Sequence, residues 1–318
     1  MGKKTTAGTS DTPQVTALPS VAATNSGLVS SVNCPTCAPP NPSPAAQGNI
    51  AGSSQYVYAA GLLAPQFESE AVAREFAQIS RGAHQGDQID VGLLQELMRS
   101  PENVYLARHL CWIYTVGGLA TFQLVPQDGA QITQFLDVLS PEESDGIVHV
   151  VVGSSVPFPI NSQCGALGLP TVQAAQVLAF PLDEFVAALP VDETTSSKDS
   201  AARKAKPDRS EFDAAARRLF MRLTRRAGYR GVSDEDRALT YLACRYSELY
   251  QAVWQAQRDG KTLVAVDAQH SHSPDGRLVS VRLVFRQPRT DITEQYEAVV
   301  EVGDVFPYMV RGLQAVFH

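Results

Sequence analysis

LVAVDAQH (263–270), RLVSVRLVFRQ (277–287) and EQYEAVVEV (294–302) carry the clearest pattern in the chain. Apolar and polar residues alternate along these segments, which is the period of a half-buried strand. The Pro-Asp-Gly tripeptide at 274–276 favours a turn between the first two. The sequence therefore predicts a small antiparallel sheet near the C-terminus, and a final helix is expected after Asp304.

Helices are predicted immediately before this sheet. Between Phe212 and Ala227 the apolar residues are spaced for one face of an amphipathic helix. Ser233 is a favourable N-cap for a second helix, and the segment from Tyr241 to Arg258 continues it or adds a third. Residues 210–318 are therefore expected to form a C-terminal unit of helices packed on a three-stranded sheet.

An N-terminal unit is predicted over residues 54–190, where strand and helix patterns alternate. Strand patterns are QYVYAAGLL (55–63), LATFQLVP (119–126) and DGIVHVVVGSS (145–155); helical spacing is found at 67–81, 91–99, 102–116, 128–139 and 171–189. The predicted fold class is α/β (α+β), with a mixed α/β unit first and helices on an antiparallel sheet second.

Two segments lack the composition of a folded core. Residues 1–53 consist mainly of Thr, Ser, Ala, Pro and Gly, and we expect a flexible tail that carries a C-x-x-C pair. Residues 191–209 are polar and charged without an apolar period, as in an interdomain linker. The chain of 318 residues is long enough for the two units between and after these segments.

The bulk composition excludes several classes of protein. There is neither an apolar run of about 18 residues, as a membrane-spanning helix needs, nor an N-terminal signal peptide, so a cytoplasmic protein is expected. Five cysteines are too few, and odd in number, for a secreted disulfide scaffold. The net charge of −7 opposes general nucleic-acid binding.

One basic segment departs from this acidic balance. Between Lys198 and Arg230 there are eleven Lys or Arg residues against four Asp or Glu residues. Within it, Arg218, Arg222 and Arg225 follow one face of the predicted helix and could bind an acidic peptide or a phosphate. The alternative is an ordinary solvated helix face.

Four of the five cysteines are candidate metal ligands: Cys34, Cys37, Cys111 and Cys164. The first two form the C-x-x-C pair, whose thiolates can chelate one tetrahedral zinc ion. Cys111, expected in a helix, and Cys164, in the loop 159–170, can complete a four-cysteine set if they meet. Spacing does not establish that they meet. The alternative is that Cys34 and Cys37 form a chance pair in the tail and that Cys111 and Cys164 are ordinary thiols of the core.

Other chemistries are open for the same residues. A thioredoxin-like redox pair is placed at a helix N-terminus, and the proline-rich run 38–42 opposes a helix there. His109, close to Cys111, could replace one thiolate. Cys244 lies on a predicted helix face and is interpreted as a buried thiol.

No catalytic signature is found in the sequence. G-x-S-x-G, the Walker loop, H-E-x-x-H and G-x-G-x-x-G are all absent. This weakens an enzymatic interpretation without excluding an unfamiliar active site.

Five stretches resemble, in the same order, the C-terminal domain of unknown function of patellamide-type cyanobactin maturation proteases. They are YVYAAGLLAPQF (56–67), VYLARHLCWIYTVGGLATFQLVPQD (104–128), the loop around Cys164, RALTYLACRYSELY (237–250) and TDITEQYEAVVEVGDVFPYMV (290–310). The resemblance covers residues 54–318. It implies a cysteine-rich lead-in and cysteines at positions 111 and 164, and therefore favours a structural four-thiolate zinc site from which Cys244 is excluded.

The resemblance also implies a role in the maturation of a cyanobactin-like ribosomal peptide. Motifs of the family's subtilisin-like protease do not occur, so we expect the domain to stand without it. The function expected is a non-catalytic zinc-stabilised accessory module that binds a precursor peptide or a partner enzyme. The alternatives are a metal-dependent or unrecognised enzyme of the same pathway, and a structural homo-oligomer such as a homodimer.

Overall fold

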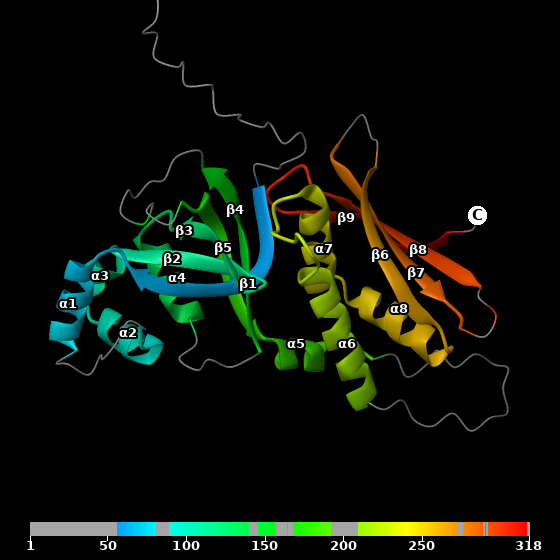
Figure 1. Cartoon of the computed structure of the whole chain (residues 1–318), viewed down its shortest axis with the longest axis horizontal. Helices are drawn as coiled ribbons and strands as arrows, with labels where there is room; N and C mark the ends of the chain where they lie inside the picture. Colours follow the sequence, from blue (N-terminus) through cyan, green and yellow to red (C-terminus); the bar gives the residue numbers. More distant parts are fainter. Residues whose placement is uncertain are drawn as a thin grey trace, which may run out of the picture. The chain divides into compact units, whose positions relative to one another are not determined.

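A computed structural model describes most of the chain after residue 55. The described residues are 56–80, 89–139, 146–156, 164, 168–191, 209–271, 276–288, 290 and 292–316. The tail predicted over residues 1–53 and nearly all of the predicted linker lie outside them. Figure 1 shows the elements of the described part. In chain order they are the strands of a first sheet with their connecting helices, then longer helices and a second sheet.

The first five strands close into a barrel. They are β1 (Tyr56–Phe67), β2 (Leu110–Val116), β3 (Leu119–Val125), β4 (Ile147–Val156) and β5 (Thr171–Pro181). The order around the barrel is β1-β2-β3-β5-β4, with β3 and β5 parallel and the other neighbours antiparallel. The helix α4 (Gly129–Val138) connects β3 to β4. This arrangement is that of an OB-fold.

Strand β1 closes the barrel because it pairs with two different strands. Its first half pairs with β4 and its second half with β2. The change of partner falls at Gly61, where a Cβ atom would overlap the carbonyl oxygen of Thr115. The buried Tyr114 hydroxyl lies 2.8 Å from the carbonyl oxygens of Ala59 and His149, and so ties β2 to both β1 and β4. The glycine and the tyrosine together hold the bend of β1.

Short helices fill the connections of the barrel. Between β1 and β2 lie α1 (Glu70–Ile79), α2 (Val91–Met98) and α3 (Val104–Ala107). Their sequences carry the expected caps: Ser69 accepts from the N–H of Val72, and Asp90 accepts from that of Leu93. Asp128 caps α4, as predicted. Inside the barrel, Trp112 packs edge-to-face on Phe135 of α4, with ring centroids 5.2 Å apart.

The second half of the chain forms helices that cover an antiparallel sheet. After the short α5 (Leu182–Ala188) come α6 (Arg209–Thr224), α7 (Asp234–Arg245) and α8 (Ser247–Arg258). The sheet follows, in the order β6 (Thr262–Ser271), β7 (Leu278–Arg286), β8 (Thr293–Glu301) and β9 (Tyr308–Val316). Alternate residues of β7, beginning with Val279, are buried beneath the helices. The α+β fold class predicted from the sequence is confirmed.

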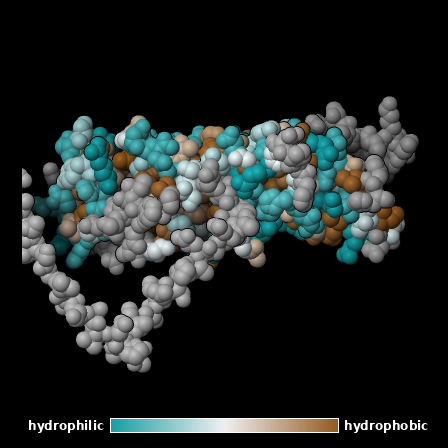
Figure 2. All heavy atoms as spheres, turned by 90° about the horizontal axis from the view of Figure 1, so that it is seen from above, coloured by the Kyte–Doolittle hydropathy of each residue, from teal (hydrophilic) through white to brown (hydrophobic). Residues whose placement is uncertain are grey.

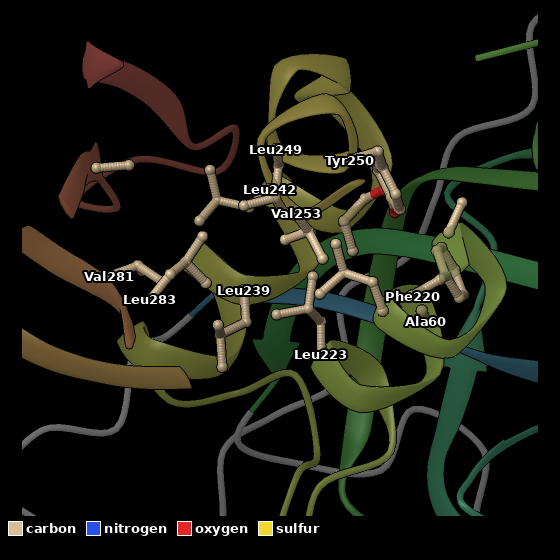
Figure 3. Close-up of a cluster of buried hydrophobic side chains, with 14 of the residues drawn as sticks. Ala60, Phe220, Leu223, Leu239, Leu242, Leu249, Tyr250, Val253, Val281 and Leu283 are labelled. Atoms are coloured by element: carbon tan, nitrogen blue, oxygen red, sulfur yellow. The ribbon is translucent and has the colours of Figure 1, made fainter. Parts of the chain in front are cut away.

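The largest apolar core is shared between the barrel and the helices. Figure 3 shows Ala60 of β1 beside side chains of α6, α7 and α8, with Val281 and Leu283 of β7 on the far side. Strand β1 reaches two cores because its alternate side chains point in opposite directions. Val57 and Ala59 belong to the barrel core, whereas Tyr58 and Ala60 belong to the shared one.

Hydrogen bonds join β1 to the turn between α6 and α7. The N–H of Tyr58 donates to the carbonyl oxygen of Gly231 at 2.9 Å, and that of Ala60 donates to the Tyr229 hydroxyl at 2.9 Å. Gly231 has a φ of 74°, and a Cβ atom there would lie 2.6 Å from the Cα of Ala59. Only glycine allows this close approach of the two backbones.

Three secondary-structure predictions are wrong. The segment 102–116 is helical only at Val104–Ala107, and Cys111 lies on β2 instead of a helix. The segment 171–189 begins with strand β5 and is helical only from Leu182. The final helix expected after Asp304 is strand β9, so the sheet has four strands instead of three.

Hydrophilic and hydrophobic residues are interspersed on the face of the molecule shown in Figure 2. None of the helices in the described ranges combines the length and the apolar character needed to cross a membrane.

The close approach at Gly231 predicts a large cost for a single methyl group. Gly231→Ala should lower the free energy of unfolding by about 2–4 kcal/mol, because a positive φ and overpacking against Ala59 both oppose the alanine side chain. Gly228, in the same turn, is the matched control: its φ is 78° but nothing lies within 4 Å of its Cβ position. Gly228→Ala should cost only about 1 kcal/mol. Equal losses in urea unfolding would show that the contact with β1 is unimportant.

A second prediction concerns His149 on β4. It is buried, and its Nε2 donates to the carbonyl oxygen of Val138 at 2.9 Å, so the neutral ring carries its proton on Nε2. Burial lowers the pKa of His149 below its ordinary value of 6.5. A lowered pKa in the folded state gives stability that is complete above the unfolded value and is lost as pH falls through the folded value.

The free energy of unfolding should therefore fall more between about pH 7.5 and about pH 5.5 in the wild type than in His149→Gln, which cannot be protonated. Chemical denaturation at the two pH values measures this. An equal fall in both proteins would contradict the assignment.

Candidate functional site

Cys111 and Cys164 meet on the outer face of the barrel. They are 53 residues apart in sequence, yet their Cα atoms lie 5.6 Å apart and their sulfurs are joined as a disulfide. Both are buried, in a small cluster with Ile113 and Leu169 that is separate from the barrel core. Cys111 takes this position because it lies on a strand, whose alternate residue Trp112 points into the barrel.

The predicted zinc ligands are thus only partly described. Two sulfurs brought together in this way fit half of a tetrahedral four-thiolate site. A disulfide and a pair of zinc thiolates are alternative states of the same residues, because ligation requires reduced sulfur. Cys34 and Cys37 lie outside the described residues. Within the residues that are described, no group of three or more His, Cys, Asp and Glu side chains is placed to hold a metal ion.

His109 lies beside a carboxylate, and Cys244 packs beside the shared core. The Nδ1 atom of His109 lies 2.7 Å from a carboxylate oxygen of Glu68, and its side chain is 50% exposed. Cys244 packs beside the shared core, and burial raises the pKa of its thiol to about 12. At this pKa the thiol is neutral and a poor ligand or nucleophile at neutral pH.

The face on which OB-folds commonly bind ligands is buried at its centre in this protein. That face is formed by strands β2 and β3 with the loops beside them. Here Ile113 of β2 and Gln123 of β3 are paired in register and both buried. Cys164 and Leu169, from the connection between β4 and β5, pack over Ile113. The centre of the usual OB ligand face, at Ile113 and Gln123, is therefore buried.

The three arginines predicted to bind an anion do not share one environment. The Arg222 guanidinium donates to the carbonyl oxygens of Leu263 and Val264 at 2.8 and 2.6 Å, so it fastens α6 to the start of β6. Arg218 is exposed on α6. Arg225, which follows the end of α6, lines a groove instead.

This groove lies between the barrel and α6 and has a volume of about 470 Å³. The barrel contributes apolar residues, among them Leu62, which is 49% exposed, and the Gly117-Gly118 turn between β2 and β3. The α6 side contributes Phe220, Met221 and Arg225. Thr115 and Thr224 also line the groove, so its walls are mixed in polarity and carry one guanidinium. Such walls suit a peptide that has an apolar residue beside an acidic one.

A buried ionic network is present that the sequence patterns did not predict. Arg237 of α7 is fully buried; its guanidinium donates to the carbonyl oxygens of Val302 and Asp304 and lies 5.5 Å from the ring centre of Tyr56. Burial lowers its pKa to about 10, which leaves it charged at neutral pH. The adjacent carboxylate of Asp234, also buried, pairs with Arg277 at 2.7 Å.

The network joins α7 to the sheet, since Arg277 precedes β7 and the two carbonyl groups follow β8. In the sequence, the acidic residues beside an arginine in Asp234-Glu235-Asp236-Arg237 could have indicated a buried ion pair. Acidic residues are equally typical of the first turn of any helix, so this pattern alone does not predict the network. We assign the network a structural role.

The described residues define an α+β protein made of an OB-type barrel and a helix-covered antiparallel sheet that share one core. The family model described as PatG Domain matches residues 56–150, and the model described as PatG C-terminal matches residues 206–315. Together they span more than half of the chain, which belongs to the PatG-type family. The family resemblance found in the sequence is thereby confirmed.

A solved structure described as "PatG Domain of Unknown Function" is similar in fold. It superposes with a TM-score of 0.61 at 19% sequence identity, and the match covers 83% of this chain and 99% of that chain. The comparison with curated proteins gave no match.

Proposed function

We propose that this chain is a non-catalytic accessory module of cyanobactin-like ribosomal peptide maturation, stabilised by zinc, that binds a precursor peptide or a partner enzyme. The observation that carries the proposal is the groove between the barrel and α6. Its size is that of a ligand site, and Arg225 supplies the positive charge that an acidic peptide needs. The family context supports a role in peptide maturation.

In this proposal zinc takes the place of the disulfide between Cys111 and Cys164. The cytoplasm expected from the sequence keeps thiols reduced, and the C-x-x-C pair would supply the remaining two ligands. Zinc would then tie the segment that precedes β1 to β2 and to the connection between β4 and β5. Its role is structural, because a closed four-thiolate shell leaves no position for substrate.

A homodimer, the structural alternative drawn from the sequence, would use an exposed surface on and before β9. Phe306, Tyr308 and Val310, which lie on β9 or just before it, are each more than half exposed. Pairing along the free edge of β9 is hindered, because the N–H groups of Met309 and Leu313 already donate to tyrosine hydroxyls of the helical layer.

The zinc proposal is tested by metal analysis of protein purified under reducing conditions without added zinc. We expect about one zinc ion per chain, lost in Cys37→Ser and in Cys111→Ser together with a lower melting temperature, because structural zinc binding is coupled to folding. Cys244→Ser is the control and should keep the metal. Metal-free protein in which Cys111 and Cys164 remain oxidised would overturn the proposal.

The binding proposal is tested by calorimetry with the precursor peptides of the pathway. Arg225→Glu should weaken binding by about 10-fold or more, because it reverses the charge in the groove. Arg258→Glu, a reversal at an exposed position of α8 outside the groove, is the matched control. Binding that is unaffected by Arg225→Glu, or equally weakened by both variants, would place the site elsewhere.

A further inference from the structure

A second cavity lies among α6, α8 and the sheet, away from both the cysteines and Arg225. Its volume is about 380 Å³. Four aromatic residues form much of the wall: Phe212 of α6, Tyr246 at the junction of α7 and α8, Trp254 of α8 and Tyr296 of β8. A cavity of this size with aromatic walls suits one apolar side chain together with its backbone amide groups.

One polar group in this wall has no partner within the described part of the fold. Trp254 is 9% exposed, and its Nε1 atom is buried without an acceptor among the described residues. Its ring is held edge-to-face against Phe212, with centroids 5.9 Å apart, so the indole does not turn freely. An indole N–H can only donate, and leaving such a donor buried and unpaired costs free energy. A carbonyl oxygen of a ligand would satisfy it.

Other polar groups of the wall are already engaged. The Tyr246 hydroxyl accepts from the N–H of Leu313 at 2.9 Å, and the Tyr296 hydroxyl donates to Glu294 at 3.4 Å. Gln251 donates to the carbonyl oxygen of Pro190 at 3.3 Å. The indole N–H of Trp254 differs from them because it has no acceptor among the described residues.

The charge of the cavity restricts the ligand further. Among the described residues that line it, Glu248 alone is charged at neutral pH, and neither Lys nor Arg is present. A carboxylate or phosphate ligand would meet this negative charge without a compensating cation. The ligand class favoured is thus an uncharged apolar group next to a carbonyl oxygen.

We propose that this cavity binds an uncharged apolar residue of a peptide, with the residue's side chain among the aromatic walls and its carbonyl oxygen accepting a hydrogen bond from Trp254 Nε1–H. The inference rests on the proposed peptide-binding function, to which it adds a second site with different chemistry. The groove at Arg225 selects an acidic residue, and this cavity selects a neutral apolar one.

The test is a titration of the full chain with N-acetyl-L-phenylalaninamide, followed by NMR of the indole N–H groups. The chain has two tryptophans, so two indole resonances are expected, and Trp254→Phe assigns them. The Trp254 resonance should shift downfield and saturate with a Kd of about 1 mM. The resonance of Trp112, buried in the barrel, should stay unchanged. The 1-amide of N-acetyl-L-aspartic acid, whose free side-chain carboxylate makes it anionic, should bind at least about 10-fold more weakly.

Ala252→Leu is the variant designed to block binding of the probe in the cavity, and Ala214→Leu is its control. Ala252 lines the cavity on α8, and leucine preserves helix formation while filling the space. Ala214→Leu makes the same change at an exposed position of α6 outside the cavity. Ala252→Leu should abolish the shift, whereas Ala214→Leu should keep it. No shift of the Trp254 resonance, a shift that persists in Ala252→Leu, or equal binding of the anionic probe would overturn the inference.

The outcomes separate this inference from the proposed function. If precursor peptides bind through Arg225 while the amide probe gives no shift, the cavity is not a site and the proposed function stands. If the probe binds as described but no precursor binds, the cavity site stands and the proposed function fails.

Discussion

The contact between β1 and the turn before α7 holds the two halves of the described structure together. In β1, one set of alternate side chains fills the barrel and the other set enters the core shared with α6, α7 and α8. The backbone of Gly231 touches Ala59, and Tyr229 reaches the N–H of Ala60. Because both faces are buried over Val57–Ala60 in the first half of β1, the barrel and the helical layer pack together as one compact unit.

Both proposed binding sites follow from this arrangement. The groove at Arg225 has one wall from the barrel and one from α6, so it exists only where these two parts pack together. The cavity at Trp254 is similarly formed by side chains of α6, α8 and the sheet, so it exists only where these elements pack together. On the face that other OB-folds use, Cys164 and Leu169 pack over Ile113. In this proposal, binding takes place at the borders of the helical layer instead of the usual barrel surface.

The elements that could be predicted from the sequence are those in which apolar residues recur at the regular spacing of a strand or a helix. β7 and β8 alternate because one face is buried, and α6 shows a helical stripe for the same reason. The strands β2, β5 and β9 were missed for three different reasons. Cysteine and isoleucine of β2 are buried on the outside while tryptophan and tyrosine are buried inside, so no alternation remains. β5 is rich in alanine and glutamine, which favour helices, and β9 is an edge strand whose Tyr308 and Val310 are exposed.

The sites were predictable to a smaller extent for a related reason. Sequence spacing identified Cys111 and Cys164 as candidates but could not bring together residues 53 positions apart. The role of Arg222 as an anchor for β6 and the burial of Arg237 depend on tertiary contacts that no local pattern encodes. The unpaired indole of Trp254 is likewise visible only once its neighbours are placed.

Photo-crosslinking from the groove between the barrel and α6 tests directly whether a peptide binds there. A photoreactive amino acid at Leu62, which lines the groove, should crosslink a precursor peptide of the pathway. The same amino acid at Ile292, which is 57% exposed and lies between β7 and β8 outside the groove, should not. We expect crosslinking to the peptide from position 62 alone. Equal yields from both positions, or a crosslink from position 292 only, would show that the groove is not the binding site.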